Sequence, residues 1–200
     1  MTTVELSGRR EQTKAANRAA ILAAAREVFG QLGYGAASVR DIIRGTGLAA
    51  GTFYNYFPDK ESIFRAVLED AGMEARGRVR AARQAARDPR TFVEGSYRAY
   101  FEWIVEDPST VALLARNAGA IRTEFDDLVT PLGVAELEED LRAGVAAGLL
   151  PADFDVEYGA HSMVAVGLTL GERLIERDPP DVDGATAFAT ELFLAGLRAL

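Results

Sequence analysis

The sequence predicts an all-α fold of about nine helices, and three observations favour this class. Apolar residues recur at helical spacing through most of the chain, and no stretch alternates apolar and polar residues for long enough to predict a strand. Pro or Gly marks the breaks between the periodic segments. The 200 residues are enough for one large domain or two small ones with a buried core.

The first predicted helix runs from about Glu11 to Leu32 and ends at Gly33. The residues before it lack periodicity, so we expect a flexible arm in which Arg9, Arg10 and Lys14 can touch a nucleic-acid backbone. An ordinary solvated tail is an equal alternative.

The segment after the first helix predicts two short helices joined by a tight turn. Ser38 and Asp41 have the spacing of a capping box, and Gly45 and Gly47 are expected to end the first of the two helices. The second helix is expected at about 49–56. This is the shape of a helix-turn-helix, whose second helix can lie in a DNA major groove. A helical hairpin with a few exposed aromatics is the alternative.

The rest of the chain also reads as helical. Asp59 is expected to cap a long helix that reaches about Arg87, and its arginines (Arg76, Arg78, Arg80, Arg83, Arg87) are interpreted as a solvated side because alanines interleave them. Further helices are expected at about 90–106, 109–118, 123–147, 154–177 and 184–199. The breaks are expected at Asp107-Pro108, Gly119, Leu149-Leu150-Pro151 and Asp178-Pro179-Pro180.

Composition and charge narrow the function classes. There is no cysteine, and no apolar run approaches the ~20 residues of a membrane span, so we expect a soluble cytoplasmic protein with no membrane partner. The single histidine, His161, has no other metal-ligating residue at a suitable spacing, so we expect it to have a structural role. We therefore expect neither a metal nor a cofactor. Residues 1–90 carry a net charge of +5 and residues 91–200 one of −13, so the N-terminal half suits phosphate contacts.

Residues 15–65 resemble the TetR family of bacterial transcriptional regulators, with the helix-turn-helix at 38–57. The matching positions are Ile21-Leu22-Ala23-Ala24-Ala25, Phe29, Gly33-Tyr34, Ser38-Val39-Arg40-Asp41-Ile42, Gly47-Leu48, Gly51-Thr52-Phe53-Tyr54, Phe57 and Lys60-Glu61. Four positions depart from the family pattern. Ala49 replaces a usual capping Ser, Ala50 replaces a frequent Lys, and Ile43 and Thr46 replace small alanines.

The resemblance implies a DNA-binding domain at 1–60 and an effector-binding and dimerisation domain at 61–200. The residues expected to face double-stranded operator DNA are Arg40, Arg44, Gly51, Thr52, Tyr54, Asn55, Tyr56 and Lys60. Those expected around a hydrophobic small-molecule effector are Tyr97, Tyr100, Trp103, Arg116, Asn117, Arg122 and Phe125. A stripe of small residues on one helix and an apolar face on the last one are expected to form a homodimer interface through Gly159, Met163, Gly167 and Leu192. Tight packing inside one subunit is the alternative for the stripe.

We therefore expect a ligand-responsive transcriptional regulator, a repressor that binds a palindromic operator as a homodimer and is released by its effector. The order of aromatic, Leu-Leu and Arg-Asn residues over 101–119 is similar to that of repressors of fatty-acid metabolism, which implies a fatty acyl or acyl-CoA effector. An aromatic or drug-like effector controlling an efflux or catabolic operon is the alternative. An α-helical enzyme or a protein-interaction module is a remote alternative, because the sequence has no visible nucleophile–base pair or phosphate loop.

Overall fold

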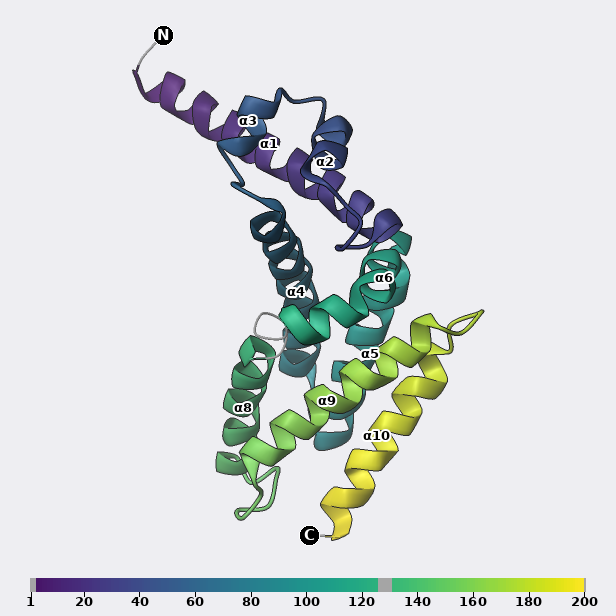
Figure 1. Cartoon of the computed structure of the whole chain (residues 1–200). Helices are drawn as coiled ribbons and strands as arrows, with labels where there is room; N and C mark the ends of the chain where they lie inside the picture. The colour runs from purple at the N-terminus through teal and green to yellow at the C-terminus, as the bar shows by residue number, and fades with distance from the viewer. Residues whose placement is uncertain (1–2, 126–130, 200) are drawn as a thin grey trace.

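The computed structural model describes residues 3–125 and 131–199, and this part of the chain contains nine α-helices and no strand (Figure 1). The all-α prediction is confirmed. The helices are α1 Thr3–Leu32, α2 Val39–Thr46, α3 Ala50–Tyr54, α4 Lys60–Ala85, α5 Pro89–Glu106, α6 Pro108–Glu124, α8 Pro131–Ala146, α9 Val156–Ile175 and α10 Val182–Ala199. None of them is long and apolar enough to cross a membrane.

The helices form a small N-terminal unit and a larger body (Figure 1). Helices α1, α2 and α3 gather at the N-terminal end, and α4 leads from them into the body formed by α5 to α10. Helix α1 also packs along α6, and α5 packs against both α4 and α10. The N-terminal unit is therefore joined to the body by side-to-side packing as well as by the chain.

The described residues contain three apolar clusters, the smallest of which holds Trp103 and Ile104 of α5. The two larger ones follow this division, but the first crosses the boundary. The core of the N-terminal unit contains Phe29, Phe53 and the first turns of α4, and it also takes in Leu113 and Phe125 from α6. The core of the body lies mainly between α5, α8 and α9. Because side chains of α6 are buried in the N-terminal core, a shift of this helix would change the packing of that core directly.

Helix α1 begins at Thr3, earlier than the predicted start near Glu11. The residues that were expected to form a flexible arm are thus helical from Thr3 onward. Glu, Leu, Arg, Gln and Lys in this segment favour a helix even where no apolar stripe is present, because that stripe is needed only where a helix packs. Arg10 and Lys14 are exposed on it, and the side chain of Arg9 lies outside the described residues.

The break expected at Gly119 is wrong, because α6 runs through this residue and ends with Phe125 as its C-cap. A glycine ends a helix when it adopts a left-handed conformation, as Gly33, Gly47 and Gly148 do with positive φ. Within a helix, glycine costs only about 1 kcal/mol relative to alanine, so packing overrides it. Of the helix predicted at 123–147, the structure describes α8 from Pro131, and residues 126–130 lie outside the described part.

The small-residue stripe of α9 packs against side chains of the same subunit, as the alternative of tight packing within one subunit expects, and its part in a dimer interface stays a prediction. A Cβ added at Gly167 would lie 3.5 Å from Tyr97, and one added at Gly159 would lie 2.5 Å from Phe154. Met163 is only 6% exposed. Small residues permit a close helix approach but do not specify whose helix approaches. Leu192, in contrast, is 50% exposed on α10.

Candidate functional sites: a helix-turn-helix and a cavity

Helix α2 starts and stops as the sequence predicts. The Ser38 hydroxyl accepts a hydrogen bond from the Asp41 backbone N–H at 3.4 Å, and the Asp41 carboxylate accepts one from the Ser38 backbone N–H at 3.1 Å. The Ser38 hydroxyl also donates to the Asp41 carboxylate at 2.5 Å, and this bond, followed by the one from the Ser38 backbone N–H, lowers the pKa of Asp41. Gly47 ends the helix with φ 67°. Gly45, which was expected to help end it, lies inside α2, and a Cβ there would approach the Ala24 Cβ to 3.1 Å. It serves close packing on α1 instead.

Helix α3 begins without a side-chain cap, as the departure at Ala49 predicts. The turn before it is held in another way. The Thr46 hydroxyl donates to the Ile43 carbonyl at 2.8 Å and accepts from the Leu48 N–H at 3.1 Å. The threonine that departs from the family pattern thus closes the turn, while Phe53 and Phe57 anchor the α3 segment in the core.

Most residues that were predicted to face DNA lie on the surface of this unit. Arg40, Arg44, Gly51, Tyr54 and Asn55 are exposed, and Thr52 is half-buried. Tyr56 is different, because it is half-buried against the N-terminal core and its hydroxyl accepts a hydrogen bond from the Asn17 side chain at 3.3 Å. Its hydroxyl therefore ties the end of α3 to α1.

Lys60 is also engaged within the protein. Its ammonium donates to the Tyr34 carbonyl at 2.7 Å and lies 4.5 Å from the centre of the Tyr34 ring. It also donates to the Gly35 carbonyl at 3.4 Å. A phosphate would have to share this ammonium with the loop between α1 and α2.

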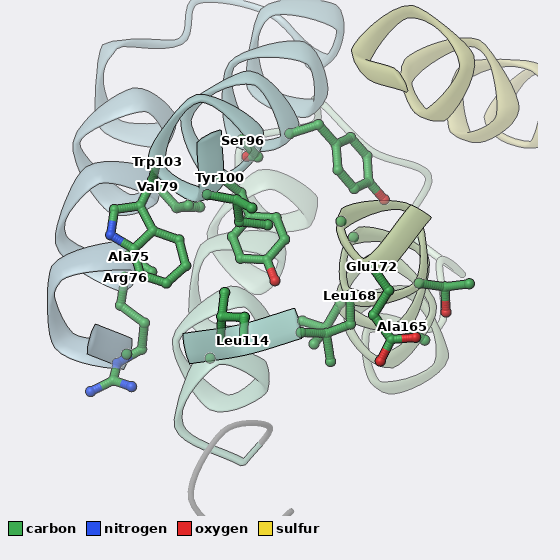
Figure 2. A pocket seen from close by; sticks show the side chains of 18 of the residues that line it. Ala75, Arg76, Val79, Ser96, Tyr100, Trp103, Leu114, Ala165, Leu168 and Glu172 are labelled. Carbon is green, nitrogen blue, oxygen red and sulfur yellow. The ribbon is translucent and has the colours of Figure 1, made fainter. Parts of the chain in front are cut away.

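A cavity of about 450 Å³ lies in the body between α4, α5, α6, α8 and α9 (Figure 2). Tyr97, Tyr100, Trp103 and Arg122, which the sequence assigns to an effector site, all line it. Much of the remaining wall is aliphatic, including Val79, Leu114, Leu137, Leu168 and Ile175. The size and the mixture of apolar walls with a few polar groups are those of a small-molecule site.

The other three predicted effector residues lie outside the cavity lining. Arg116 is exposed and lies beside Gly33. Phe125 is 1% exposed and packs edge-on against Phe64 with ring centroids 4.8 Å apart. These residues lie on faces of α6 that turn toward the N-terminal unit. The spacing in the sequence alone could not show which face of the helix meets the cavity.

Asn117 is the third such residue, and it bonds across the boundary between the two parts. Its carboxamide oxygen accepts a hydrogen bond from the Tyr34 N–H at 2.6 Å, and its amide donates to the Phe29 carbonyl at 3.0 Å and the Leu113 carbonyl at 2.7 Å. It is 2% exposed. An α6 side chain therefore satisfies backbone groups at the C-terminal end of α1.

Three arginines of the cavity wall form ion pairs with carboxylates of other helices. Arg83 binds Asp140 at 2.6 Å and is 8% exposed, so the interpretation of α4 arginines as a solvated side is wrong for this residue. Arg76 pairs with Glu136 at 3.8 Å, and Arg122 with Glu172 at 3.6 Å. Sequence reasoning missed Arg76, Arg83, Glu136 and Glu172, because each pair joins helices that are far apart in the chain.

The geometry combines a helix-turn-helix with a ligand-sized cavity in the helical body. Residues 21–67 match the sequence model described as bacterial regulatory proteins, tetR family. Residues 21–67 thus carry a TetR-type helix-turn-helix DNA-binding domain, and the chain as a whole is similar to TetR-family transcriptional regulators.

Solved structures share the fold over most of the chain. A TetR-family transcriptional regulator from Pectobacterium atrosepticum is 25% identical with a TM-score of 0.72, covering 98% of this chain and 97% of its own. The fatty acid degradation regulator FadR from Bacillus halodurans is 20% identical with a TM-score of 0.78, covering 90% and 96%. FadR from Bacillus subtilis in complex with stearoyl-CoA is 19% identical with a TM-score of 0.76, covering 88% and 97%.

Proposed function

We propose that the protein is a ligand-responsive repressor that binds a palindromic operator as a homodimer and is released by a hydrophobic acyl effector. The observation that carries the proposal is the double role of α6. Leu114, Ala118 and Ile121 of this helix line the cavity. Leu113 and Asn117, which lie on the adjacent face of the same helix, contact the N-terminal unit.

Helix α6 can therefore couple the two sites. An effector that pushes on the cavity face of α6 also moves Asn117 and Leu113, which hold α1 and the loop before α2. Gly30 of α1 adds to this contact, because a Cβ there would lie 3.3 Å from Ala112. Such packing transmits shifts, since close-packed interiors do not deform smoothly. A coupling of about 1–3 kcal/mol would lower operator affinity by roughly 5–150-fold.

The proposed dimer interface is the exposed apolar face of α9 and α10. Tyr158 is 73% exposed, Phe188 is 62% exposed and Leu192 is 50% exposed. Large apolar side chains that are exposed on a helix face favour association. A two-fold axis through this face would present two α3 helices to two half-sites of one operator.

Two observations support an acyl effector. The walls of the cavity are largely aliphatic, and the structurally similar FadR from Bacillus subtilis was solved in complex with stearoyl-CoA. Arg122 has a side chain that is 65% exposed, so it lies where a polar head group would leave the cavity. The stacked Tyr100 and Trp103, with ring centroids 6.0 Å apart, favour the second candidate, an aromatic or drug-like effector.

Titration of a labelled duplex from upstream of the protein's own gene, at several salt concentrations, tests the proposal. We expect binding that weakens steeply with salt. Arg40→Ala should lower affinity and reduce the salt slope by about 1, whereas Arg142→Ala, an exposed cation of α8, should change neither. Added decanoyl-CoA should release the duplex. An affinity that does not change with salt concentration, or equal losses of affinity in the two variants, would contradict the DNA-binding assignment.

A further inference from the structure

Tyr100 is a polar cavity residue whose hydrogen-bonding capacity the fold leaves unused. Figure 2 shows its hydroxyl pointing into the space beside Leu114 and Leu168. No residue in the described part of the chain makes a hydrogen bond with this hydroxyl. Tyr97 of the same helix differs, because its hydroxyl donates to the Met163 carbonyl at 3.1 Å. One tyrosine thus ties α5 to α9, and the other presents a donor to the cavity.

The position of the Tyr100 ring is well defined. It stacks on Trp103 with an angle of 27° between the rings, and a Cβ added at Gly171 would lie 3.2 Å from the Tyr100 ring edge. Contacts on two sides restrict rotation of the side chain. The hydroxyl is therefore aimed before a ligand arrives, which reduces the entropy cost of binding.

The charges around the cavity disfavour an anion next to this hydroxyl. Arg76, Arg83 and Arg122 are each paired with a carboxylate. A buried ligand anion would have to displace one of these carboxylates or lie near it. Burying a charge without a partner costs far more than burying a hydrogen-bonded neutral group.

We propose that Tyr100 is a specificity-determining residue that donates a hydrogen bond to an uncharged acyl carbonyl of the effector. The cavity then prefers a thioester or ester to the free carboxylate of the same chain length. This inference rests on the proposed function, because it takes an acyl effector as the occupant. Burial, followed by the nearby Glu172 carboxylate, raises the pKa of Tyr100, so the phenol remains a donor at neutral pH.

Three probes of equal chain length test the inference: the decanoyl thioester of N-acetylcysteamine, the S-decyl thioether that lacks its carbonyl, and decanoate. Trp103 reports their binding, because it is the only tryptophan of the chain and lines the cavity. We expect the wild-type protein to bind the thioester about 2–10-fold more tightly than the thioether, the gain from one neutral hydrogen bond, and to bind decanoate most weakly.

In Tyr100→Phe, which removes no hydrogen bond between residues that the structure describes, the preference for the thioester over the thioether should disappear. Tyr158→Phe is the control: it removes a hydroxyl from an exposed residue of α9 that lies outside the cavity lining, so it should keep the preference. If Tyr100→Phe kept the preference for the thioester, the proposed role of Tyr100 would be overturned, but the proposed acyl effector would not. Decanoate binding as tight as that of the thioester would overturn the selection against charge. A wild-type protein that binds none of the probes would overturn the acyl effector, and this inference with it.

Discussion

The helix-turn-helix and the cavity differ in the distance along the chain over which their contacts form. In the N-terminal unit, key hydrogen bonds join residues two or three apart, such as Ser38 with Asp41 and Thr46 with Leu48. Around the cavity, ion pairs join separate helices, as in Arg83 with Asp140. The caps and turns of the helix-turn-helix therefore depend on neighbours in the chain, although its core also takes in residues of α6. The walls of the cavity, in contrast, come from helices that are far apart in the chain.

The largest expected effect tests how far the N-terminal unit depends on its core. Phe53 is 0% exposed, and Phe53→Ala should destabilise the protein by about 3–5 kcal/mol through lost burial and the cavity left behind. Tyr54→Ala is the matched control, because Tyr54 is 54% exposed and should change stability by less than about 0.5 kcal/mol. Urea unfolding followed by circular dichroism measures both. Similar losses in the two variants would contradict the assignment of the buried face of α3.

The next effect concerns the junction between the two parts. Asn117→Ala leaves the Phe29 carbonyl and the Tyr34 N–H without their side-chain partner, and should destabilise by about 1–3 kcal/mol. It should also weaken the release of operator DNA by effector, because α6 would no longer hold the loop before α2. Arg116→Ala, on an exposed position of the same helix, should leave both properties unchanged. If Asn117→Ala kept full effector response, coupling would run by another route.

A smaller and opposite effect is expected at the uncapped start of α3. Ala49 has the extended backbone of an N-cap, φ −67° and ψ 146°, but no side-chain hydrogen bond. Ala49→Ser should stabilise the protein by about 1 kcal/mol, since a serine hydroxyl can accept from the free N–H groups of the first turn. Ala50→Ser, one position inside the helix, should give no gain. Thermal unfolding compares the two, and equal melting temperatures would show that the turn held by Thr46 already makes a cap unnecessary.

The smallest effect is a loss of stability in acid that both parts share. Hydrogen bonds from Ser38, Ser62 and Thr91 lower the pKa values of Asp41, Asp59 and Asp88. A carboxylate with a depressed pKa contributes its full stability above its ordinary pKa of about 4, and loses it as the pH falls through the folded value. The melting temperature should therefore fall as the pH is lowered below about 4.

Asp41→Asn should make that fall shallower, since one of the carboxylates that must be protonated is gone. Asp153→Asn changes an exposed carboxylate in the segment between α8 and α9 and is the control. A pH profile that Asp41→Asn leaves as steep as in the wild-type protein would contradict the role of the α2 cap.

The same contrast explains what could be predicted from the sequence. The cap at Ser38 and the turn at Gly47 depend on neighbours in the chain, and the structure confirms both of them. Helix content was predictable because the apolar period is a local signal. The early start of α1 was not, since it depends on helix propensity without a packed face.

The cavity could be predicted only in part. Tyr97, Tyr100 and Trp103 share one helix, so their spacing places them together. Whether Asn117 faces the cavity or the N-terminal unit depends on the rotation of α6, which is set by its packing on α1. The same limit applies to the small residues of α9, whose partner helix no local pattern identifies.

Gly171 has a consequence for how the ligand range of such a regulator can diverge. A Cβ at this position would lie 2.8 Å from the end of the Ile104 side chain and 3.2 Å from the Tyr100 ring, so even alanine would displace these two side chains. This wall therefore tolerates little variation in side-chain volume. Val79 on α4 and Leu114 on α6 are half-buried and face the space directly. Related sequences with different effectors should accumulate their size changes at these two positions and retain the glycine.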